Sequence, residues 1–100
     1  MLKIRVNKEN NIIKEIKFNG HTEYADYGKD IVCASASTML ITTVNAIYKI
    51  DKDAIKKEET EEITITNIKK DKITNDLLLN LYEMLKELEK QYKNNIKIYE

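Results

Sequence analysis

The segment from Ile31 to Ile50 constrains the fold most, because it is long, apolar and free of charged residues until Lys49. Apolar residues recur at every fourth position of its first part: Val32, Ala36, Leu40 and Val44. This spacing is typical of one face of an α-helix. We therefore predict a helix that begins at Ile31 and is mostly buried.

Shorter segments on both sides of this helix have the alternation of β-strands. At the N-terminus, Leu2, Ile4 and Val6 alternate with polar residues, as expected for a strand with one buried face. A second strand is predicted over 12–18, after an asparagine-rich turn over 7–11. The two should pair as an antiparallel hairpin. Further strands are predicted at 54–59, 63–68 and 96–99.

A second amphipathic helix is predicted after the lysine-rich 69–72 segment. Thr74 or Asn75 has the residue type of its N-cap, and Asn94 follows its last turn. Its apolar stripe comprises Leu78, Leu81, Leu85, Leu88 and Tyr92. The predicted element order is therefore β-β-α-β-β-α-β. It indicates an α+β fold, with two helices packed on a mixed, largely antiparallel sheet of about five strands.

Composition limits both the size of the domain and its partners. One hundred residues suffice for a single domain, here 1–100, which should bury somewhat over ~60% of its unfolded surface. Lys plus Arg and Asp plus Glu both number 17, which argues against a direct nucleic-acid binder. The N-terminus has no signal-peptide pattern, and no stretch was expected to span a membrane. We expect a cytoplasmic protein.

The single cysteine and the single histidine lie in one stretch, from Gly20 to Ser37. If the helix begins at Ile31, Asp30 is its N-cap and Cys33 lies in its first turn, where unpaired amides stabilise a thiolate. His21 lies near a strand exit, and the intervening loop can bring it close to Cys33. A cysteine with a distant histidine is also compatible with a buried thiol and a surface imidazole. Four metal ligands are not available, so neither a metal nor another cofactor is expected.

The same stretch resembles the signature of the ribosomal-processing cysteine protease (Prp) family. The likeness is carried by the pair Gly20-His21 and by the sequence GKDIVCASAS from Gly28 to Ser37. Family members are also similar in length and element order. Thr22, Lys29 and Ala36 depart from residues common in the family, and all three adjoin the signature residues.

The resemblance implies a protease with a Cys-His dyad, in which Cys33 is the nucleophile and His21 the general base and acid. Gly20 and the helix-start amides would contribute to the oxyanion site, and Ser37 would lie one turn after Cys33. Asp30 would cap the helix or orient His21. The family's substrate is the N-terminal extension of large-subunit ribosomal protein number twenty-seven, cut after two aromatic residues. The family also implies a homodimer.

The loop residues Tyr24 and Tyr27 are candidates for contacting an aromatic peptide, or are part of an ordinary solvated loop. Two other functions stay open for the whole chain. One is a non-enzymatic, ribosome-associated binding module in which His21 and Cys33 are inert. The other is a different thiol enzyme, such as an acyl transferase. Measuring thiol reactivity distinguishes a binding module from a protease. A peptide cleavage assay distinguishes an acyl transferase from a protease.

Overall fold

The computed structural model describes residues 1–20 and 27–100, and side chains outside 21–30. The observed elements are β1 (Leu2–Glu9), β2 (Ile12–Asn19), α1 (Tyr27–Ile50), β3 (Ile55–Glu59), β4 (Ile63–Asn67), α2 (Lys72–Gln91) and β5 (Ile96–Tyr99). The predicted order β-β-α-β-β-α-β is confirmed, and so is the α+β class.

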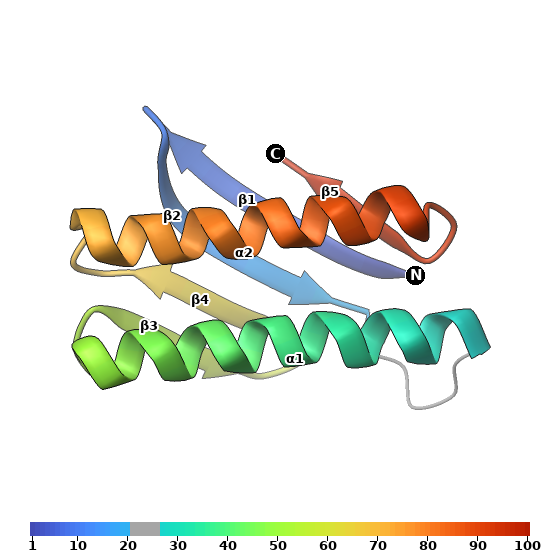
Figure 1. The fold of residues 1–100 in the computed structure, drawn as a ribbon, viewed down its shortest axis with the longest axis horizontal. Helices are drawn as coiled ribbons and strands as arrows, with labels where there is room; N and C mark the ends of the chain where they lie inside the picture. The colour runs from blue at the N-terminus through green and yellow to red at the C-terminus, as the bar shows by residue number, and fades with distance from the viewer. Residues whose placement is uncertain (21–26) are drawn as a thin grey trace.

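The strands form one mixed sheet in the order β3-β4-β2-β1-β5. The pair β1 and β5 is parallel, and the other three pairs are antiparallel. Both helices lie side by side on one face of this sheet, α2 over its centre and α1 below it in the view of Figure 1. No helix of the described residues lies on the opposite face of the sheet. The molecule therefore has two layers, with the core between them.

The β1–β2 hairpin turns more tightly than predicted. Asn10 and Asn11 have φ of 52° and 63°, and β1 continues to Glu9 instead of ending near Val6. Two consecutive left-handed residues are typical of a type I′ turn, and asparagine tolerates this conformation. The short turn lengthens β1 by residues 7–9, which the composition had assigned to the turn, and β2 begins at Ile12 as predicted.

A bulge in β2 lets two isoleucines three positions apart face the core. Asn7 pairs with Glu15 and Lys8 with Ile13, so Lys14 is the extra residue. Ile13 lies beyond the β2–β4 pairing, which begins at Glu15, and side chains bind its backbone there. Asn75 Oδ1 accepts the Ile13 amide at 2.9 Å, and Asn67 Nδ2 donates to the Ile13 carbonyl at 2.8 Å.

The predicted N-cap of α2 is wrong. Asp71 caps the helix, and its Oδ1 accepts the Thr74 amide at 3.1 Å. Thr74 is buried inside the first turn, and Asn75 is used to bind the β2 bulge. Three residues here have the chemistry of a cap, and tertiary contacts decide which one serves.

The prediction of a mostly buried α1 is only half right. Its four-residue repeat is buried as expected, together with Ile47. Its outer side is not, since Ile41 is 51% and Ile50 59% exposed. The helix packs against α2 and the sheet on one side only.

The expectation that no stretch could span a membrane is wrong by length and composition, because Ile31–Ile50 has a mean hydropathy of 1.5. Core helices of soluble proteins meet the same criterion, and this one contributes a core face.

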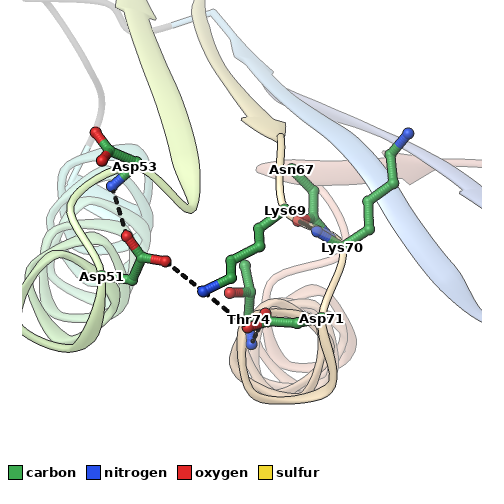
Figure 2. A network of polar contacts seen from close by, with 7 residues as sticks. All are labelled: Asp51, Asp53, Asn67, Lys69, Lys70, Asp71 and Thr74. Atoms are coloured by element: carbon green, nitrogen blue, oxygen red, sulfur yellow. Dashed lines mark hydrogen bonds and ion pairs between the residues drawn. The ribbon is translucent and has the colours of Figure 1, made fainter.

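A polar network joins the end of α1 to the start of α2 (Figure 2). Lys69 Nζ lies between two carboxylates, 2.6 Å from Asp51 Oδ2 and 3.7 Å from Asp71 Oδ2. The other Asp51 oxygen accepts the Asp53 amide at 2.9 Å. The hydrogen bond from Lys69, followed by that from Asp53, lowers the pKa of Asp51. The hydrogen bonds from Thr74 lower the pKa of Asp71.

These lowered pKa values predict a specific loss of stability in acid. An unfolded aspartate titrates near its ordinary value of 3.8, and the folded Asp51 titrates below it. The stabilising contribution is therefore present above pH 3.8 and is lost as the pH falls through the folded value. We expect the urea midpoint to fall over this range, and to fall less steeply in Asp51→Asn. Asp53→Asn is the matched control, because its side chain points away from Lys69 in Figure 2. Identical pH profiles for wild type and Asp51→Asn would contradict the assignment.

Candidate active site

Cys33 lies farther into α1 than the sequence predicted. The helix begins at Tyr27 and not at Ile31, so Cys33 is in the second turn. Asp30 is inside the first turn and is not the N-cap. Gly28 does not prevent helix formation here, and a carboxylate near the positive end of the helix dipole is favourable. Asp30, which was predicted to be the N-cap, is therefore also suited to a position inside the first turn.

This shift changes how the helix acts on Cys33. The unpaired amides of an α-helix belong to its first four residues, here 27–30. Cys33 therefore does not lie among the unpaired amides, as the predicted start required. Side chains of a helix lean toward its N-terminus. The Cys33 side chain is thus inclined toward the turn that carries those amides.

Cys33 and Ser37 share one side of α1, one turn apart, beside the buried Val32 and Ala36. Cys33 is a free thiol, and both residues are half-buried. Among the described residues, no hydrogen bond involves the Ser37 hydroxyl, whereas Thr38 Oγ1 on the outer side donates to the Ala34 carbonyl at 2.9 Å. Thiol and hydroxyl therefore form a small polar strip at the edge of the core face, open to solvent.

Gly20 follows the last residue of β2 and has a conformation that requires glycine. Its φ is +99°, and a Cβ at this position would overlap the Met1 carbonyl oxygen. Both the left-handed backbone and the close approach exclude a side chain. The backbone at position 20 thus explains why glycine stands there in the predicted Gly20-His21 pair. The conformation of Gly20 fixes the direction in which the chain leaves the sheet. In Figure 1, β2 ends on the same side of the molecule as α1 begins.

The other predicted site residues are only partly covered. His21 and Tyr24 lie outside the described residues. For Tyr27 and Asp30 the structure gives helical backbone, and their side chains lie outside the described part. The structure therefore places Gly20 at the strand exit and Cys33 with Ser37 on the helix. Within the described residues, no group of three His, Cys, Asp or Glu side chains is arranged to hold a metal ion.

Comparisons with known proteins agree with this arrangement. The family model described as "Cysteine protease Prp" matches residues 1–97. The ribosomal processing cysteine protease Prp of Staphylococcus aureus is 29% identical over 99 residues, which are 95% of this chain and 92% of that protein.

Two crystal structures of S. aureus Prp have the same fold. The complex with a substrate peptide has a TM-score of 0.90 at 23% identity, with both chains fully covered. The complex with a covalently linked product peptide has a TM-score of 0.86 at 23% identity, covering 99% of this chain and 98% of the other. The family match over nearly the whole length, together with the position of Cys33, leads to one assignment: this chain belongs to the Prp family of cysteine proteases.

Proposed function

We propose that this protein removes a short N-terminal extension from large-subunit ribosomal protein number twenty-seven, with Cys33 as nucleophile and His21 as general base and acid. The observation that carries the proposal is the position of Cys33. It is the one cysteine of a chain that matches a cysteine protease family over residues 1–97, and it lies half-buried at the edge of the core face of α1. Family membership favours this reading over an inert binding module and over an acyl transferase.

The proposed reaction has two halves. His21 takes the proton from Cys33, and the thiolate attacks the carbonyl carbon of the scissile peptide bond. The tetrahedral intermediate breaks its C–N bond as His21 delivers the proton to the leaving amine, which leaves an acyl group on Cys33 as a thioester. Water, deprotonated by His21, then attacks the thioester. The acid product leaves, and the thiolate recovers its proton.

Supporting roles follow from the described backbone. The amides of the first turn of α1, toward which the Cys33 side chain inclines, are the donors that we assign to the developing oxyanion, together with backbone at Gly20. Ser37 is assigned a hydrogen bond to the substrate or the intermediate from one turn away. Asp30, no longer a cap, is assigned to orient His21. Tyr24 and Tyr27 are proposed to contact the aromatic residues before the cut.

The test is mass spectrometry of a peptide that spans the N-terminal extension of that ribosomal protein from the same organism. The S. aureus relatives solved with substrate and product peptides make a peptide the appropriate probe. A single cut after the aromatic pair supports the proposal. An intact peptide, with folded protein and reduced thiol, contradicts it. We propose that residues 1–100 form one domain. Because the proposed substrate is a ribosomal protein, we also place the protein in the cytoplasm.

We also propose a homodimer, formed through the outer side of α1. Ile41 and Tyr48 lie two turns apart on this side and are 51% and 38% exposed. A patch of exposed apolar side chains is typical of a protein interface. Light scattering at micromolar concentration should give a dimer for wild type and a monomer for Ile41→Lys. Ile73→Lys on α2, equally exposed at 54%, is the matched control and should stay dimeric. A monomeric wild type contradicts this proposal.

A further inference from the structure

The face of the sheet opposite α1 and α2 presents an unusual arrangement of positive charge. Lys3 and Arg5 project from this face of β1, because Leu2, Ile4 and Val6 project into the core. The register places Arg5 directly opposite Lys17 of β2, and Lys3 directly opposite Lys97 of β5. Two like-charged pairs therefore lie side by side across three strands.

Such pairs are unfavourable unless an anion compensates them, since like charges directly opposite one another destabilise a sheet. Glu15 lies 3.8 Å from Lys17 and compensates only that residue. Within the described part of the chain, no ion pair involves Lys3, Arg5 or Lys97. Arg5 instead lies over the Tyr99 ring, with its guanidinium carbon 5.3 Å from the ring centroid. The positive charge of Lys3, Arg5 and Lys97 is thus not neutralised by an ion pair within the described part of the chain.

The same residues line a trough. One hollow of about 250 Å³ is lined by Lys3, Arg5, Lys17, Asn19, Glu62 and Tyr99. A second hollow of about 400 Å³ adjoins it and shares Arg5 and Lys17, with Lys8, Glu15 and Glu100 among its other lining residues. The carboxylates here are engaged in part: Glu62 accepts Asn19 Nδ2 at 3.4 Å, and Glu100 accepts the Tyr82 hydroxyl. Lys8 in the second hollow is paired with Glu100 at 3.7 Å. The trough therefore combines the Tyr99 ring with two cations, Lys3 and Arg5, that make no ion pair with another described residue.

We propose that this trough binds single-stranded RNA, with Lys3 and Arg5 on phosphates and Tyr99 available for stacking on a base. Recognition here must use side chains, because β1 and β2 are paired on both sides and offer no free backbone edge to a peptide strand. Cations beside an aromatic residue on an open sheet face suit phosphates and bases. The choice of RNA rests on the proposed function, since a ribosomal-protein substrate is located among RNA.

The zero net charge of the chain does not conflict with this site. The 17 basic and 17 acidic residues cancel only as a sum. Electrostatic attraction for RNA depends on the local surface within about one Debye length, ~8–10 Å. The expectation that excluded direct nucleic-acid contact was drawn from this sum and from the alternation of charge along the chain. The two hollows gather basic side chains that are apart in sequence, Lys3, Arg5, Lys8 and Lys17, beside Glu15, Glu62 and Glu100.

The experiment is fluorescence anisotropy of a labelled oligouridine of about 12 nucleotides, a length within the usual site sizes. Wild-type protein should bind, with an affinity that falls as salt rises. The Lys3→Gln/Arg5→Gln variant should bind more weakly and reduce the slope of log affinity against log salt by about 1.4, since each lost phosphate contact removes about 0.7. Lys49→Gln/Lys52→Gln, with the same change of charge at exposed residues around the C-terminal end of α1, should bind like wild type. Neither variant should unfold at a lower temperature than wild type, because these side chains are exposed and the Lys3→Gln/Arg5→Gln variant relieves the like-charged pairs.

Several outcomes overturn the inference: no binding by wild type at low salt, equal weakening in both double variants, or preference for an acidic peptide of equal charge over the RNA. Peptide cleavage is measured on the same samples. Cleavage without RNA binding removes this inference and leaves the proposed function. RNA binding without cleavage removes the proposed function and leaves the trough as an RNA site.

Discussion

Cys33→Ala is expected to abolish peptide cleavage and to leave the fold intact. Removing the nucleophile of a covalent mechanism eliminates the acyl-enzyme route, and losses of about 10⁴-fold or more in kcat are typical. The fold should survive because Cys33 is only half-buried and lies outside the apolar core, and alanine is the best helix former. The measurement is the rate of product formation by mass spectrometry, together with the thermal midpoint of the same sample.

Ser37→Ala is the matched control for this experiment. It removes a polar atom from the same strip of α1, one turn later, with the same burial class as Cys33. A residue that supplies one hydrogen bond near the reacting atoms should cost no more than about 10²–10³-fold. Turnover by Cys33→Ala within about tenfold of wild type would show that another group attacks the peptide. Loss of folding in both variants would be visible in the thermal midpoint.

Much of the fold was predictable because its signals are local. The two-residue alternation of Leu2, Ile4 and Val6 and the four-residue repeat of α1 each follow from which side of one element meets the core. The order of elements then allowed few ways to cover one face of a sheet with two helices. The bulge at Lys14 was not predictable, because it depends on Asn67 and Asn75 binding a backbone far away in sequence.

Helix starts were the weakest part of the prediction, for one physical reason in both cases. Asp, Asn and Thr are suited to the N-cap and are also accepted in the first turn. At α2 the choice between Asp71 and Thr74 was decided by burial of Thr74. At α1 the assignment of Asp30 placed the helix start four residues too late. The identity of Cys33 as the candidate nucleophile did not depend on that start, because the chain has one cysteine.

His21→Gln is expected to give the second-largest loss, and its chemical signature separates a catalytic base from a structural histidine. General acid–base catalysis contributes about 10²–10⁴-fold, so kcat/KM should fall by that factor. An unassisted cysteine thiol ionises near pH 8.5, so alkylation by iodoacetamide should proceed readily at neutral pH in wild type and shift toward alkaline pH in the variant.

Glutamine is close in size to histidine and retains hydrogen bonding, but it cannot carry the proton. If His21 had only a structural role, the substitution would lower the thermal midpoint and leave the alkylation profile unchanged. An unchanged profile with full cleavage would remove His21 from the dyad, and the base would then have to be a carboxylate or water, because the chain contains no second imidazole.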